Sequence, residues 1–343
     1  MWVFSKHRWG GLAAATLLIT AAMTASADSG WEGLRGKELL EAVGASCRPT
    51  VLRESLASPG GVWEAFRTTD ALTDGGVDNR FSDDTAKFPA DGHSAPPTME
   101  AVAILPPLWW GESMADGSAQ GRDLHNLLPA PIGTGDVKRN YPPGKVTAAE
   151  FDNGVWKAGI GLVDGIEINM YQPPQGYEGD FARAVMYMVA AYPCDFWKNL
   201  GENFMTDNFP ILQPWAVRQL MAWHNSDPVS DRERQRDDAV AALQGNHNPF
   251  VTDPALADYI WGEKGGQPFT PDPPQLIPIR AYYSLSDPRI DLYSPHIPQE
   301  AQWSVDGTAV TADYLVPATL GAGTHELRFS ADGIEGKLKI IVR

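Results

Sequence analysis

Residues 121–145 read GRDLHNLLPAPIGTGDVKRNYPPGK and hold the densest polar and basic cluster in an otherwise acidic chain. An Asp-Leu-His-Asn run at 123–126 is followed by a turn region rich in proline and glycine, and then by Lys138, Arg139 and Asn140. A base, a metal ligand and a phosphate clamp are the groups that phosphodiester cleavage uses, and His, Asn and Arg can supply them. The same side chains could instead form a hydrogen-bonded loop that only stabilises the fold. The sequence leaves both interpretations open.

The first 27 residues have the features of a signal peptide. Lys6 and Arg8 precede a short apolar run, and Ala-Ser-Ala at 25–27 has the pattern of a cleavage site. The apolar run is shorter than the roughly 20 residues that span a bilayer. We therefore expect cleavage after Ala27, a secreted or periplasmic protein of residues 28–343, and no membrane-spanning segment.

The charge of the chain opposes long-range attraction to nucleic acid. The formal net charge is −16, and removal of Lys6 and Arg8 with the signal peptide lowers it to −18. Nucleic-acid binding favours basic surfaces and depends on salt. Lys138 and Arg139 form an adjacent basic pair near the candidate site, so we expect them and Asn140 to contact nucleic acid only weakly.

The two cysteines, Cys47 and Cys194, could form a disulfide bond in an oxidising compartment. Closing a loop of that length would stabilise the fold by roughly 4–5 kcal/mol in the chain-entropy description. Two buried free thiols are an equal alternative, because the sequence does not give the distance between them.

Helical and strand patterns alternate along the first 262 residues. Apolar spacing predicts two helices within 34–66, separated at Pro59-Gly60. Ser230 and Glu233 form a capping-box pair, and Gly245 ends the helix that they open. Within that helix we interpret the run DRERQRDD at 231–238 as a solvated face. The other expected elements are a buried strand at 99–108, a hairpin at 151–170, and helices at 180–192, 214–224 and 254–261.

A linker rich in proline and glycine at 263–275 predicts a domain boundary. Beyond it, short alternating segments that end in Asp-Gly turns predict a small all-β unit. We expect an α+β domain at 28–265 and a β-sandwich at 276–343.

Several blocks, in order, resemble the secreted bacterial endonuclease I family, which has the ββα-metal nuclease fold. The matching blocks are WEAFRTTD at 63–70, RFSD at 80–83, FPADG at 88–92, WWG at 109–111, DLHNLLP at 123–129, RNYPPG at 139–144, GDFARAVMYM at 179–188, DPVSDRERQRDDAVAALQGNHNPF at 227–250 and ADYIWG at 257–262. The resemblance covers about residues 34–262. The C-terminal part resembles immunoglobulin-like modules of secreted enzymes.

The resemblance implies Mg²⁺-dependent, non-specific hydrolysis of DNA or RNA. In the family, a Glu-His pair before the Trp-Trp-Gly segment supplies a metal ligand and the general base, and an Asn after the DLHNL segment is the second ligand. Counting from these anchors places the Glu and His on Val102 and Ala103, and the Asn on Gly135. None of these residues can bind a metal or move a proton. We therefore expect no metal ligand at these positions.

Other residues could substitute for the missing groups. The candidates are His93, Glu100, His125 and Asp136, whereas the resemblance gives Asp123, His125 and Asn126 a site-framing role. His247, within QGNHNPF, is interpreted as a residue that fixes a loop. The favoured hypothesis is an inactive family member. The alternatives are an active nuclease that uses the substitute ligands, and a surface protein whose C-terminal module binds a protein or glycan.

Overall fold

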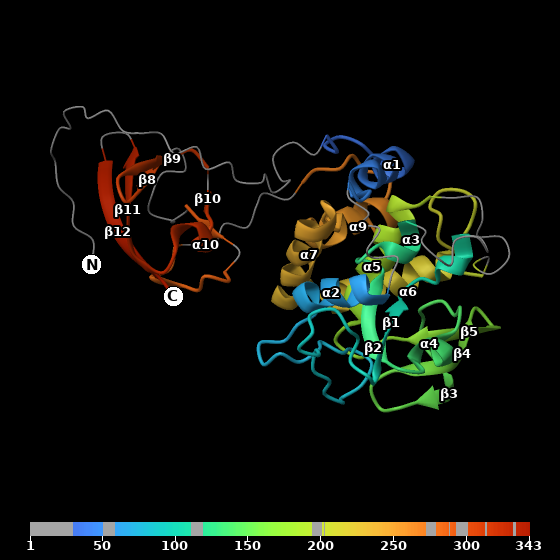
Figure 1. Ribbon diagram of the computed structural model, residues 1–343. Coiled ribbons are helices and arrows are strands. Elements are labelled where there is room, and N and C mark those ends of the chain that lie inside the picture. Colours follow the sequence, from blue (N-terminus) through green and yellow to red (C-terminus); the bar gives the residue numbers. More distant parts are fainter. Residues whose placement is uncertain are drawn as a thin grey trace. The chain divides into compact units, whose positions relative to one another are not determined.

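The computed structural model describes residues 30–50, 59–110, 119–193, 201, 203–271, 279–287, 289–292, 301–312, 314–331 and 334–343 (Figure 1). Contacts separate a unit at Asp28–Asp272 from a unit that contains Pro273–Arg343. The first is a mixed α+β unit and the second is predominantly β. The expected signal peptide lies outside the described residues. No helix within the ranges above is long and apolar enough to cross a bilayer.

Helix α5 (Glu178–Ala191) lies at the centre of the first unit, and its residues 179–191 are all buried. A helix that is apolar around most of its circumference is buried on all sides, which confirms the helix expected at 180–192. Helices α1 (Gly36–Cys47), α6 (Pro214–Ser226) and α8 (Pro249–Thr252) contact it. Gly44 permits the close approach of α1, because a Cβ there would overlap the carbonyl oxygen of Ala190. The other helices of this unit are α2 (Pro59–Thr69), α3 (Ala119–Arg122), α4 (Thr134–Lys138), α7 (Asp231–Gln244) and α9 (Ala255–Trp261).

Helix α7 begins and ends where its local sequence predicts. The hydroxyl of Ser230 accepts a hydrogen bond from the amide of Glu233 at 3.1 Å. Gly245 ends the helix with a φ of 80°, a left-handed conformation that glycine adopts without steric cost.

The interpretation of residues 231–238 as a solvated face is wrong, because Glu233, Arg236 and Asp237 are buried. Arg236 donates to Asp70 at 2.7 Å and to the carbonyl of Leu127 at 2.7 Å. Charged residues can be buried when they are paired, so a run of polar residues does not by itself mark an exposed helix face. Arg236 and Glu233 pair with Asp70 and Arg183, which lie 166 and 50 residues away in sequence, so the local sequence does not show these partners.

Strands β1 (Met99–Ala103) and β2 (Leu127–Pro131) form an antiparallel pair in which Val102 lies opposite Leu128. The strand expected at 99–108 is therefore shorter, and the 3-10 helix η2 (Pro107–Trp110) follows it. After Ala103 the amides of Ile104 and Leu105 donate to the backbone and side chain of Asn126, which precedes β2, and the prolines at 106 and 107 have no N–H with which to continue the pairing. Helix α4 follows β2 directly and contacts β1.

The hairpin expected at 151–170 belongs to a three-stranded antiparallel sheet. Its strands are β3 (Ala148–Asp152), β4 (Lys157–Val163) and β5 (Ile166–Gln172), with β4 in the middle. Cys47 is a buried free thiol on α1, as in the alternative without a disulfide bond, and Cys194 lies outside the described residues.

The C-terminal unit contains a five-stranded sheet in the order β6-β12-β11-β8-β9 and a two-stranded sheet of β7 and β10. Its own core includes Trp303, Leu327, Phe329 and Ile340. Alternate residues of β11 are buried, as the sequence pattern predicts for a half-buried strand. The elements are β6 (Tyr282–Tyr283), β7 (Ile290–Asp291), β8 (Gln302–Val305), β9 (Thr308–Val310), β10 (Tyr314–Leu315), α10 (Pro317–Leu320), β11 (Gly323–Ala331) and β12 (Ile334–Val342).

Candidate functional site

The strand-strand-helix unit of β1, β2 and α4 brings Val102 and Gly135 together. A Cβ placed on Gly135 would lie 3.8 Å from Cγ1 of Val102. These are the positions that the family resemblance assigns to the two metal ligands, and they converge although they lie 33 positions apart in the sequence. Neither residue has a side-chain atom that could bind a metal. The two positions that the resemblance assigns to metal ligands therefore lie side by side, and neither offers a ligand atom.

Ala103, the position assigned to the general base, lies on the other face of β1. Val102 belongs to the core cluster that includes α5, whereas Ala103 packs against a second cluster that includes Trp63 and Leu127. Adjacent residues of a strand point to opposite faces, which accounts for the separation.

Glu100 lies on the same face of β1 as Val102 and reaches the position left by Gly135. Its Oε1 accepts a hydrogen bond from the amide of Gly135 at 2.8 Å. A Cβ on Gly135 would lie 3.5 and 3.8 Å from the two carboxylate oxygens of Glu100. Glu100 is thus the substitute candidate that the structure brings to this point.

The other substitute candidates lie in different surroundings. His93 is exposed in the loop before β1, where its amide donates to Asp91 at 3.0 Å. Asp136 is exposed on α4, next to Gly135 in sequence.

His125 is buried, its Nε2 lies 3.1 Å from the carbonyl oxygen of Asn246, and its ring packs on Tyr187 with centroids 4.5 Å apart. Its Nδ1 lies 3.9 Å from Oδ1 of Asp237, too far for a hydrogen bond. This packing is typical of a structural histidine rather than of a base that faces substrate.

Asp123 and Asn126 connect elements that are distant in sequence. The Asp123 carboxylate accepts hydrogen bonds from the hydroxyls of Tyr187 at 2.6 Å and Tyr192 at 2.7 Å. The Asn126 side chain accepts from the amide of Leu105 at 2.8 Å and donates to the carbonyl of the same residue at 3.0 Å. Both side chains are fully buried, so they hold the 121–145 stretch in place instead of contacting a ligand.

The basic pair at the end of α4 has one side chain in the interior and one at the surface. Lys138 is only 2% exposed, with its Nζ 4.5 Å from the centre of the Tyr171 ring. Burial lowers the pKa of Lys138 to about 7. Arg139 and Asn140 are exposed, and Arg139 donates to the hydroxyl of Tyr141 at 2.8 Å. Of the three residues expected to contact nucleic acid, the structure presents two to solvent.

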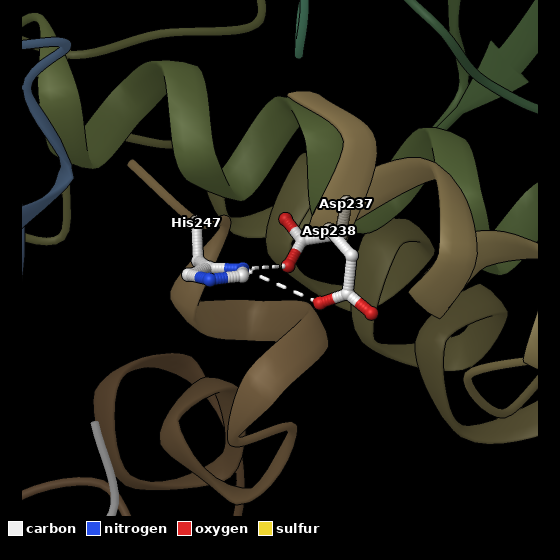
Figure 2. A group of neighbouring side chains, drawn as sticks. All are labelled: Asp237, Asp238 and His247. Atoms are coloured by element: carbon white, nitrogen blue, oxygen red, sulfur yellow. Dashed lines mark hydrogen bonds and ion pairs between the residues drawn. The ribbon is translucent and has the colours of Figure 1, made fainter. Parts of the chain in front are cut away.

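A group of ligand-type side chains that the sequence interpretation missed consists of Asp237, Asp238 and His247 (Figure 2). Nδ1 of His247 lies 2.6 Å from Oδ2 of Asp237 and 3.9 Å from Oδ1 of Asp238. The hydrogen bond to Asp237 raises the pKa of His247 above its usual range. The adjacent aspartates and the histidine after Gly245 are visible in the sequence, but only the turn that follows α7 brings them together.

Comparison of the sequence with known proteins gives matches to one family of nucleases. The endonuclease I family model matches residues 80–255. The chain is 30% identical over 261 residues to an extracellular ribonuclease of Bacillus subtilis (strain 168), an alignment that covers 72% of this chain and 83% of that protein. It is 31% identical over 160 residues to an extracellular ribonuclease of Bacillus amyloliquefaciens, which covers 44% of this chain and 52% of the relative. It is also 32% identical over 131 residues to an extracellular deoxyribonuclease of Aeromonas hydrophila, with 38% and 48% covered. These matches confirm the resemblance, and the chain belongs to the endonuclease I family.

Proposed function

We propose that this chain is a secreted endonuclease I-family protein that has lost most or all of its nuclease activity. The observation that supports this most strongly is the pair of Val102 and Gly135, which face each other where the resemblance places the two metal ligands. The relatives named as extracellular ribonucleases and a deoxyribonuclease support nucleic acid as the ancestral substrate class and support secretion.

The residues around Gly135 do not fit the Mg²⁺ ion that the family implies. Mg²⁺ is bound in octahedral geometry, through one or two carboxylates together with waters and substrate phosphates. Glu100 is the carboxylate that lies against Gly135, and Val102 and Gly135 have no side-chain donor atom, so one carboxylate stands where the resemblance places two protein ligands. We therefore derive no catalytic step through a metal here.

The expected loss of nuclease activity can be estimated from the contributions of a general base and a metal ion. A positioned general base contributes about 10²–10⁴ in rate. A metal contributes several kcal/mol of transition-state stabilisation, and each 1.36 kcal/mol corresponds to tenfold in rate. Loss of both should reduce cleavage to the level of a protein-free control.

The alternative is an active nuclease in which Glu100 serves as the surviving acidic ligand. The specific observation in its favour is the approach of the Glu100 carboxylate to the Gly135 position. Because a Cβ on Gly135 would make ordinary van der Waals contacts, a Gly135→Asn variant should fold and place an amide oxygen beside Glu100.

Plasmid nicking by the purified protein, with Mg²⁺ or Mn²⁺ and with a chelator, distinguishes these proposals. We expect no chelator-sensitive cleavage by the natural sequence. Chelator-sensitive cleavage that Glu100→Gln abolishes would overturn the proposal of inactivity and establish the alternative. Gly135→Asn and the double variant Glu100→Gln/Gly135→Asn test whether a restored amide recovers metal binding through Glu100.

We further propose that any remaining nucleic-acid contact is weak and involves Arg139 and Asn140, which are exposed, and not Lys138, which is buried. The net charge of −16 supports weak, salt-sensitive binding. In a fluorescence anisotropy titration with labelled DNA, Arg139→Ala should weaken binding and Lys138→Met should not. Nanomolar affinity that does not change with salt would contradict this proposal.

We propose that β1, β2 and α4 correspond to the ββα-metal unit, and that the C-terminal unit is an immunoglobulin-like β-sandwich that binds a protein or glycan. Two sheets around a separate core support the second statement. A glycan array and a pull-down with the full chain and with a chain that ends at residue 265 would test it. Equal binding by both chains would exclude the C-terminal unit as the binding module. For secretion, N-terminal sequencing of the exported protein should begin at Asp28.

A further inference from the structure

We propose that Asp237, Asp238 and His247 form a binding site for one divalent transition-metal ion, with Zn²⁺ as the best match. The site is made by the middle of α7 and the turn that follows this helix (Figure 2). It shares no residue with the Glu100–Gly135 position, and the proposal does not depend on whether the chain cleaves nucleic acid.

The three ligand atoms lie close together. One donor atom from each of the three side chains lies within 4.8 Å of the other two. In a tetrahedral zinc site with bonds of about 2.0–2.1 Å, neighbouring ligand atoms lie about 3.3 Å apart. The observed separations from Nδ1 of His247, 2.6 Å to Asp237 and 3.9 Å to Asp238, lie on either side of that value. Small side-chain rotations would bring all three atoms to bonding distance.

The Asp237 carboxylate is oriented by a hydrogen bond from a residue outside the three proposed ligands. The Asp237 side chain is 4% exposed. Its Oδ1 accepts a hydrogen bond from the amide of Asn248 at 2.7 Å, which turns Oδ2 toward His247. Hydrogen bonds to the far oxygen of a ligating carboxylate orient it and are a regular feature of metal sites.

The charge of the group also matches a divalent ion. Two carboxylates and a neutral imidazole carry a charge of −2, which one divalent ion neutralises; without an ion, His247 is the partner of the buried Asp237 carboxylate. The ion can enter from solvent, because the side chains of Asp238 and His247 are 52% and 35% exposed. One nitrogen and two oxygen ligands favour Zn²⁺ and its transition-metal neighbours, whereas Mg²⁺ prefers oxygen ligands alone.

Nδ1 of His247 can carry a proton or bind the metal ion, but not both. The C-terminal unit contains a histidine–aspartate pair that resembles His247 and Asp237 but has no second carboxylate in the group. Nδ1 of His325 lies 2.7 Å from Asp306, and Nε2 of His325 lies 3.0 Å from the carbonyl oxygen of Gly321. Both ring nitrogens of His325 therefore have hydrogen-bond partners. This pair should hold a proton and no metal, and it serves as the internal control.

The test uses the full chain, stripped of metal, in a calorimetric titration with Zn²⁺ at pH 7.5 and in visible spectroscopy with Co²⁺. We expect one ion per chain at micromolar concentration, displaced by neither millimolar Mg²⁺ nor Ca²⁺. Asp238→Asn and His247→Gln should each raise the dissociation constant at least tenfold, the lower end of what loss of a supporting group costs. His325→Gln should leave it unchanged.

A second measurement separates loss of the site from loss of the fold. Zn²⁺ should raise the thermal unfolding midpoint of the natural chain and of His325→Gln, but not that of Asp238→Asn, since an ion that binds only the folded state stabilises it. Asp238 is exposed, so its variant should fold normally. No binding at millimolar Zn²⁺, or equal binding by the natural chain and the Asp238→Asn and His247→Gln variants, would overturn the proposal.

Discussion

Replacing Lys138 by methionine should stabilise the folded chain, most strongly at neutral and acidic pH. Lys138 is 2% exposed, and its ammonium group lies over the Tyr171 ring at 4.5 Å. Methionine has a similar length and no charge, so it can keep the packing against Tyr171 without placing a cation in the interior. The variant therefore tests the energetic consequence of burying this amine.

The magnitude follows from the pKa of Lys138, which burial lowers from 10.5 to about 7. Each pKa unit corresponds to 1.36 kcal/mol, so the protonated amine costs at most about 5 kcal/mol below pH 7. The contact with the Tyr171 ring offsets about 1–2 kcal/mol of this cost, which leaves an expected gain of about 3 kcal/mol. Between pH 7 and 10.5 the folded chain has released the proton that the unfolded chain keeps. The cost, and with it the gain from methionine, therefore shrinks as the pH rises through this range.

Urea unfolding followed by tryptophan fluorescence at pH 6.5, 8.5 and 10 would measure the change in unfolding free energy. Lys157→Met is the control, because Lys157 is 45% exposed beside Asp152 and should show a small change without this pH dependence. A gain from Lys138→Met that is equal at all three pH values, or a loss at pH 6.5, would refute the reasoning. The first result would mean that the amine is solvated in the folded chain.

Three further variants test the buried polar contacts. Arg236→Met should lower the free energy of unfolding by about 3–5 kcal/mol, since Asp70 would lose its ion-pair partner in the interior; a urea midpoint near that of the natural chain would contradict this. Ser230→Ala removes the N-terminal cap of α7 and should cost about 1 kcal/mol in the same assay. His247→Gln should cost about 1–3 kcal/mol at pH 5.5 and less at pH 9. The reason is that the pKa of His247 is raised by Asp237, so this contribution is complete below the unfolded pKa and lost as the pH rises through the higher folded value. An equal cost at both pH values would show that the pair is not charged.

The sequence predicted those elements whose determinants lie within a few residues of each other. The apolar character of 180–192 predicted α5, and Ser230, Glu233 and Gly245 predicted both ends of α7. The predicted strand at 99–108 is longer than β1, because the apolar run continues past Ala103, where pairing with β2 ends at Leu127. Local sequence patterns predict where a helix or strand begins and ends, but they do not predict which of its faces is buried.

For the candidate site, the sequence by itself determined which chemical groups are missing. Val102, Ala103 and Gly135 carry no metal-binding or basic side chain whatever the fold, and the resemblance implies that these positions correspond to the metal ligands and the base of the family. Only the tertiary structure decided what surrounds them. The Glu100 carboxylate accepts a hydrogen bond from the Gly135 amide. Lys138 is buried, whereas the adjacent Arg139 is exposed. Arg236 pairs with Asp70, which lies 166 residues away in sequence. The physical reason is that burial and the partners of a charge depend on contacts between distant segments, and these determine whether a polar side chain binds a ligand or stabilises the fold.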